Sequence, residues 1–141
     1  LFPYTTLFRS AFSFTNYGGT DNFSDVPAGS YYAQAIASAK AMGIAQGSGD
    51  KFRPTAALTR EDAMVLLQRT LNRTGRTIPD ASGFYLDYFS DGASVSSYAQ
   101  SAVAALIQAG IIQGDDTGKI NPKGSLTRAE MAIILHRVLT L

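Results

Sequence analysis

The sequence contains no cysteine and a single histidine, His136. Without cysteine, the chain has no thiol nucleophile, no disulfide framework and no metal site built on cysteine ligands. One histidine gives no basis for a Ser–His–Asp triad, and we expect His136 on the solvent side of a helix or at the edge of a groove. The sequence therefore predicts a protein that is not an enzyme and binds no metal or cofactor.

Charge is also scarce. Twelve Lys and Arg residues stand against eleven Asp and Glu residues, which leaves a net charge of +1. The basic residues are scattered along the chain, so nothing favours a nucleic-acid partner. No apolar run approaches the roughly 20 residues that a membrane-spanning helix needs, and no signal peptide is visible.

The N-terminal segment does not read as native protein. Residues 1–10 resemble the conceptual translation of a sequencing-library adapter, and they lack periodicity; the alternative is a native exposed strand. Residues 11–22 mix Phe, Ser, Thr, Gly and Asn, as a linker does. If residues 1–10 are not native, the missing signal peptide says nothing about localisation.

The chain does contain an internal repeat. Short phrases recur in the same order with an offset that grows from 66 to 68: Phe23-Ser24-Asp25 and Phe89-Ser90-Asp91, Gly43-Ile44 and Gly110-Ile111, Leu58-Thr59-Arg60 and Leu126-Thr127-Arg128. A repeat that keeps its order while its loops change length is a duplicated structural unit. We assign residues 23–71 and 89–141 to the two repeats and residues 72–88 to a linker. Units of this kind usually bind rather than catalyse.

Each repeat carries two stretches of apolar residues at helical spacing. In the first stretch one face is formed by Tyr32, Ala35, Ile36, Ala39 and Met42. Ser30 is the expected N-cap, and Gly43 followed by Ile44 predicts a Schellman ending. The linker ends in a run too apolar to stay in solvent, 84–89, which we expect to pack back onto one unit. The predicted fold is all-α, with two tandem helical hairpins side by side.

The second helix of each repeat begins at a capping phrase. Thr127 and Glu130 form a capping box, and Thr59 with Asp62 forms a version of shorter reach. The box does not explain Arg60 and Arg128, because the partial positive charge at a helix N-terminus disfavours arginine there. One explanation is a bound carboxylate or phosphate. The other is that the arginine stem covers apolar surface, or that the guanidinium pairs with Asp25 and Asp91.

With these phrases in order, the sequence resembles the S-layer homology (SLH) repeat of bacterial cell-surface proteins. The hallmark phrase of that repeat, Thr-Arg-Ala-Glu, is intact at 127–130. The first repeat has Thr-Arg-Glu-Asp in its place, at 59–62. The resemblance implies helical-hairpin repeats that form a pseudo-threefold bundle and bind secondary cell-wall polysaccharide, often bearing a pyruvate ketal. It implies an extracellular, wall-attached or S-layer-attached protein. The alternative is a protein-interaction or self-assembly module of a surface-layer protein.

The resemblance also implies a set of ligand-binding residues. They are the two arginines of the Thr-Arg phrases, the aromatic and Asp positions before the first helices, and the glycines of the loops: Arg60, Arg128, Tyr31, Tyr98, Asp25, Asp91, Gly47 and Gly114. The family often has tryptophan at the aromatic position, and this chain has none. The family also usually has three repeats, so we expect a third repeat as a partner, upstream or in another chain.

Overall fold

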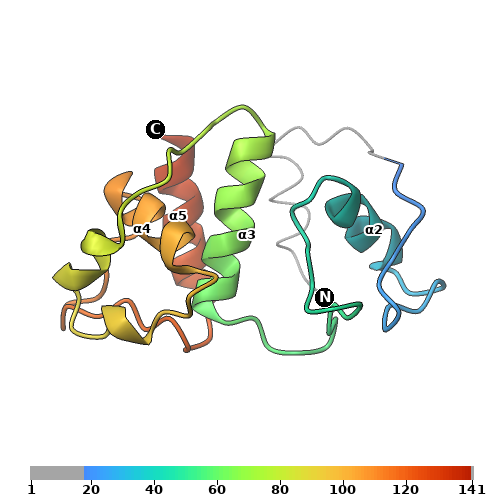
Figure 1. Ribbon diagram of the computed structural model, residues 1–141, viewed down its shortest axis with the longest axis horizontal. Coiled ribbons are helices and arrows are strands. Elements are labelled where there is room, and N and C mark those ends of the chain that lie inside the picture. The colour runs from blue at the N-terminus through green and yellow to red at the C-terminus, as the bar shows by residue number, and fades with distance from the viewer. Residues whose placement is uncertain (1–17, 141) are drawn as a thin grey trace. The chain divides into compact units, whose positions relative to one another are not determined.

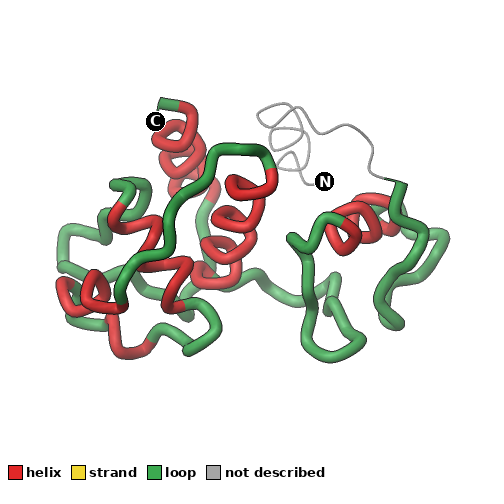
Figure 2. The backbone as a smooth tube through the Cα atoms, turned by 45° about the horizontal axis from the view of Figure 1, so that its top comes forward, coloured by secondary structure: helices red, strands yellow, loops and turns green. Residues whose placement is uncertain are grey.

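The structure, a computed structural model, describes residues 18–140. The expectations for residues 1–10 and for the first part of the 11–22 linker lie outside the described residues. The described chain forms α-helices and 3₁₀ helices joined by loops and contains no strand (Figures 1 and 2). In chain order they are α2 (Ala33–Ala41), α3 (Arg60–Arg73), η1 (Gly83–Tyr88), η2 (Gly92–Ser94), α4 (Gln100–Gln108) and α5 (Arg128–Leu139). The predicted all-α class is confirmed.

The chain divides into two compact units, which meet in sequence at Ala56 and Ala57. The boundary lies inside the first repeat, so α2 belongs to the first unit and α3 to the second. Unit 1 builds its core around α2. One cluster of this core consists of Phe23, Val26, Ala33, Ile36 and Ala45.

Helix α2 ends as the sequence predicts but begins at a different residue. At the C-terminal end, Gly43 has a φ of 71° and the amide of Ile44 donates to the Ala39 carbonyl at 2.9 Å, which is the predicted Schellman ending. At the N-terminal end the cap residue is Tyr32 rather than Ser30, and it makes no side-chain cap. The helix therefore starts two residues later than predicted. Ala35, which was expected to face inward, is exposed.

Unit 2 pairs helices from different repeats. Helix α3, from the first repeat, packs against α4 of the second repeat. Helices α3 and α5 run in the same direction, because Arg60 at the start of α3 pairs with Glu130 near the start of α5, while Arg76 just beyond α3 donates to the Val138 carbonyl near the end of α5. The sequence pattern predicted the helices but not this exchange of partners.

Helix α4 is the most deeply buried element of unit 2. Its residues Val103, Ala104, Ala105 and Leu106 are 0% exposed. Both α3 and η1 pack on it. The 84–89 segment therefore does pack back as expected, through the buried Leu86 of η1.

Candidate functional site

The two predicted Asp residues hold loops in place. Asp25 accepts hydrogen bonds from the amides of Phe52 and Arg53, each at 2.8 Å. Asp91 accepts the equivalent bonds from the amides of residues 120 and 121, at 3.0 and 2.8 Å. The bond from the Phe52 amide is the main reason that the pKa of Asp25 lies below its usual value. Both carboxylates are thus engaged with backbone, and a direct role in ligand binding stays a prediction.

The two predicted loop glycines lie against aromatic rings. Gly47 and Gly114 have φ angles of 63° and 74°, a conformation that favours glycine. A Cβ atom on Gly47 would lie 2.6 Å from the ring of Phe23, and one on Gly114 would lie 2.6 Å from the ring of Phe89. The structure therefore gives both glycines a packing role, and contact of their amides with a ligand stays a prediction.

The N-terminus of α3 has no vacant first-turn amides. Thr59 accepts a hydrogen bond from the amide of Asp62 at 3.2 Å. The amides of Arg60 and Glu61 donate to carbonyls of the 122–124 turn, at 2.9 and 3.0 Å. The second repeat therefore supplies the acceptors for these amides, and an anion bound at this helix stays a prediction.

The Arg60 guanidinium is also engaged within the protein. Its Nε donates to the carbonyl of Ile120 at 2.8 Å, and Nη1 lies 2.6 Å from Oε1 of Glu130. Its side chain is 11% exposed. The ion-pair partner of Arg60 is therefore Glu130 rather than Asp25 or Asp91, and contact of Arg60 with a ligand stays a prediction.

The N-terminus of α5 is capped by the chain itself. The Thr127 amide donates to Oε2 of Glu130 at 2.8 Å, and the Glu130 amide donates to Oγ1 of Thr127 at 3.3 Å, which together form a capping box. Arg128 and Ala129 lie exposed between them. The two arginines of the repeat therefore differ: Arg60 is enclosed within unit 2, and Arg128 faces solvent.

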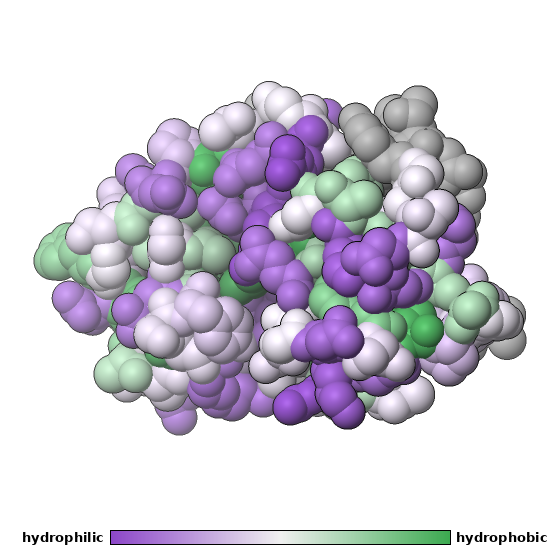
Figure 3. Space-filling model, turned by 45° about the vertical axis from the view of Figure 1, so that its right-hand side comes forward, coloured by the Kyte–Doolittle hydropathy of each residue, from purple (hydrophilic) through white to green (hydrophobic). Residues whose placement is uncertain are grey.

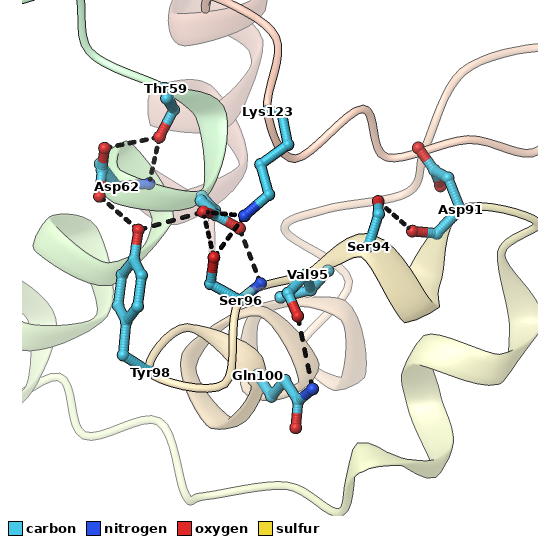
Figure 4. Close-up of polar contacts among 10 residues, drawn as sticks. Thr59, Asp62, Asp91, Ser94, Val95, Ser96, Tyr98, Gln100 and Lys123 are labelled. Atoms are coloured by element: carbon cyan, nitrogen blue, oxygen red, sulfur yellow. Dashed lines mark hydrogen bonds and ion pairs between the residues drawn. The ribbon is translucent and has the colours of Figure 1, made fainter.

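The buried carboxylate of Glu61, at the start of α3, connects the two repeats. The side chain of Glu61 is 4% exposed. It accepts hydrogen bonds from the amide and hydroxyl of Ser96 at 3.0 and 2.8 Å, from the Tyr98 hydroxyl at 3.1 Å, and from Nζ of Lys123 at 2.6 Å. The Tyr98 hydroxyl also lies 2.8 Å from Oδ1 of Asp62. Figure 4 shows Ser96, Tyr98 and Lys123 converging on this point from the second repeat.

Sequence reasoning missed most of this network. The predicted site residues do not include Glu61, Ser96 or Lys123. Lys123 is 62 residues from Glu61 in the chain, so no local spacing connects them. The available signal was that Glu61 stands where the second repeat has Ala129, a substitution that needs a partner if the glutamate is buried.

The tyrosines at the predicted aromatic positions are both accessible. Tyr98 is 57% exposed, with its hydroxyl held by the acids of α3. Partial burial and the hydrogen bond to Asp62 raise the pKa of Tyr98 above its usual value, so its phenol stays protonated. Tyr31, in unit 1, is 82% exposed. Its ring packs edge-to-face with the ring of Tyr32, with the two ring centroids 5.0 Å apart.

The starts of α3 and α5 thus form one exposed end of unit 2. It presents Arg128, the ring of Tyr98 and the half-exposed side chain of Lys123 over a hydrogen-bonded base. In the described residues, no group of three or more His, Asp or Glu side chains is placed to hold a metal ion. On the face drawn in Figure 3, hydrophilic and hydrophobic residues interleave.

The S-layer homology domain matches the chain at residues 22–64 and 88–132. The chain belongs to the S-layer homology family. Cell-wall anchoring is the usual role of S-layer homology domains, which are non-catalytic modules of cell-surface or S-layer-attached proteins. None of the helices described between residues 18 and 140 has the length and apolarity required to cross a membrane.

Three curated relatives share this S-layer homology region. An amylopullulanase of Thermoanaerobacterium thermosulfurigenes and the exoglucanase XynX of Acetivibrio thermocellus are each 36% identical over 83% of the chain. A surface-layer 125 kDa protein of Lysinibacillus sphaericus is 30% identical over 95% of the chain. The chain spans 6% of the first relative and 11% of each of the other two, so it corresponds to a small part of proteins that are otherwise different.

The carboxylates of this end predict a fall in stability at acid pH. Burial raises the pKa of Glu61, but hydrogen bonds from Lys123, Ser96 and Tyr98 outweigh it and bring the pKa below the usual 4.5. The hydrogen bonds from Thr127 are the main cause of the lowered pKa of Glu130. As pH falls through 4.5, the unfolded chain takes up protons before the folded chain does, so the stabilisation present above this pH is lost progressively below it.

Thermal unfolding followed by circular dichroism from neutral pH to about pH 3 tests this. The melting temperature is expected to hold above pH 4.5 and to fall below it. The Glu61→Gln variant should show a shallower fall. A melting temperature that does not change across the acid range would contradict the assigned pKa shifts.

Proposed function

We propose that this chain anchors its protein to the cell wall by binding an acidic secondary cell-wall polysaccharide, one that carries carboxylate groups such as pyruvate ketals. The observation that carries the proposal is the difference between two equivalent arginines. Arg60 is enclosed by Glu130 and the Ile120 carbonyl, whereas Arg128 is exposed at the first position of α5. A guanidinium there, with the positive end of the helix dipole behind it, is suited to a carboxylate.

In this proposal some of the other predicted residues contact the glycan, and the rest hold the loops and helix starts in place. Tyr98 offers an exposed ring face to a sugar, and its hydroxyl is fixed by the start of α3, so the ring keeps one orientation. Tyr31 offers the equivalent ring in unit 1. Arg60, Asp25, Asp91, Gly47 and Gly114 shape the loops and the helix starts beneath these contacts. Lys123, which the sequence did not single out, adds a second cation beside Tyr98.

The proposed module is extracellular and attached to the wall or S-layer, and a third repeat, upstream or in another chain, completes its bundle. Any catalysis would belong to other parts of the protein, in the way that two of the relatives are named as enzymes. The second candidate is a self-assembly module, which the exposed apolar side chains of α5 favour: Ile133 is 50% exposed and Leu139 is 53% exposed.

Co-sedimentation with Gram-positive wall sacculi tests the anchoring function. The chain is expected to pellet with intact sacculi and to stay in solution with sacculi from which the secondary polymer has been extracted by acid. Arg128→Ala should weaken binding about tenfold or more, the effect of losing one charge-assisted contact. The matched control is Arg73→Ala, which removes an exposed arginine from the last turn of α3.

Two results would count against the proposal. Equal binding to extracted and intact sacculi would place the ligand in the peptidoglycan rather than in the secondary polymer. Equal weakening by Arg128→Ala and Arg73→Ala would mean that binding depends on overall charge and not on the start of α5.

A further inference from the structure

The first halves of the two repeats, residues 23–56 and 89–124, resemble each other in sequence and in local structure. Each begins with Phe-Ser-Asp, and the carboxylate of that Asp accepts hydrogen bonds from the amides of the two residues before a loop proline. Each also ends its helix with a glycine at positive φ, Gly43 or Gly110. In the structure residues 89–124 cover one face of α3, through α4 and the backbone carbonyls of the 122–124 turn. A chain with two such similar segments needs a contact that decides which of them α3 accepts.

The apolar contacts of α3 do not make this decision. Its buried residues include Met64, Leu67 and Leu71. The helices of the two first halves, α2 and α4, are both rich in alanine and both carry branched aliphatic residues. Apolar burial is non-directional and depends on area, so it discriminates poorly between two such helices. Selection between similar partners needs a polar or charged group that one of them fails to satisfy.

The start of α3 carries such a group. The side chain of Glu61 is 4% exposed, and Nζ of Lys123 lies 2.6 Å from its Oε1. Lys123 directly follows the loop proline of the second repeat, whereas the first repeat has the neutral Thr55 after its proline. In the place of residues 89–124, a segment with threonine at this position would bury the carboxylate without a counter-ion. That arrangement is strongly unfavourable, because no cation then offsets the cost of removing the charge from water.

This requirement acts in one direction. The side chain of Lys123 is 53% exposed, so its amine can be hydrated when no carboxylate faces it. Glu61 has no comparable access to water. Helix α5 has Ala129 at the position of Glu61, and an alanine imposes no charge requirement on a segment that packs against it. The glutamate is therefore the selecting residue, and the lysine is the residue that is recognised.

We propose that Glu61 makes α3 selective for a covering segment that has a cation directly after the loop proline. Residues 89–124 meet this requirement and residues 23–56 do not, so the ion pair fixes which first half packs on this face of α3. A segment from another repeat or another chain would be accepted there only with lysine or arginine at that position. Fixing one pairing among similar ones is a known role of buried polar groups. The proposal does not depend on glycan binding.

Hydrogen exchange at the α3 amides of the full chain tests the selection, because protection there reports the packing of α3. Lys123→Thr gives the second repeat the neutral residue of the first, and it is expected to lower the protection about a hundredfold. Adding Glu61→Ala should restore the protection to within about tenfold of the natural chain, since no buried carboxylate then remains. Lys123→Arg should keep most of the protection, because it keeps a cation at this position.

Two controls separate selection from a general loss of packing. Lys119→Thr removes an exposed lysine from the same loop and should leave the protection unchanged. Glu61→Gln combined with Lys123→Thr fills the space that Glu61→Ala leaves, and should also restore protection. If neither double variant were better protected than Lys123→Thr alone, the lysine would act independently of Glu61 and the proposal would be overturned. Unchanged protection in Lys123→Thr would overturn it as well.

Discussion

Lys123→Met is expected to lower the free energy of unfolding by about 3 kcal/mol, the cost of leaving a buried carboxylate without its counter-ion. Glu61 is 4% exposed, so water cannot replace the amine that lies 2.6 Å away. The hydrogen bonds from Ser96 and Tyr98 remain, and they keep the loss below that of a fully isolated buried charge. Urea unfolding followed by circular dichroism measures the change.

A substitution of the other member of the ion pair, Glu61, is the informative control. Glu61→Gln removes the same ion pair but leaves Lys123, whose side chain is 53% exposed and can be hydrated. Its cost should be about 1 kcal/mol, that of one weakened hydrogen-bond network. If Lys123→Met cost no more than Glu61→Gln, the carboxylate would not be buried as described and the network would contribute little.

Arg60→Ala is expected to destabilise the protein by about 3 kcal/mol, because it removes a charge-assisted bond and an ion pair from an enclosed site. The carbonyl of Ile120 loses its donor, and Glu130 loses the guanidinium that lies 2.6 Å away. The same change at the equivalent exposed position, Arg128→Ala, should shift the stability by less than about 0.5 kcal/mol. Parallel urea titrations of the two variants compare them directly.

This pair of variants separates the two roles that the repeated arginine could have. A large loss of stability at Arg60 and a small one at Arg128 would agree with the geometry. Similar losses at both positions would mean that Arg128 is also enclosed, and the argument for its contact with a ligand would fail. Arg60→Lys is a further check, since a lysine keeps the charge but cannot reach both acceptors in the same geometry.

Local patterns predicted the elements of this fold well. Glycine after an apolar helix fixed the ends of α2 and α4, since Gly43 and Gly110 both adopt positive φ and the amides that follow them close the same bonds. The capping phrase placed the starts of α3 and α5 at Arg60 and Arg128. These features depend on residues within one turn of each other, so spacing alone reveals them.

The partners of the elements were not predictable in the same way. The pattern paired α3 with α2, because these two helices of the first repeat are adjacent in sequence. In the structure α3 packs on α4 of the second repeat instead. For the same reason the acceptors of its first amides, Pro122 and Gly124, were missed, and Glu130 was not foreseen as the ion-pair partner of Arg60. Contacts between residues about 60 apart leave no periodic trace in a single sequence.

The measurement that tests the anchoring account most directly is a calorimetric titration of the full chain with purified acidic wall polymer, and with the same polymer after its carboxyl groups have been reduced. The account predicts binding to the native polymer that weakens with added salt, is lost on carboxyl reduction and is weakened by Arg128→Ala. Equal affinity for the native and the reduced polymer would contradict it, because recognition would then not involve a carboxylate and Arg128 would have no ligand to hold.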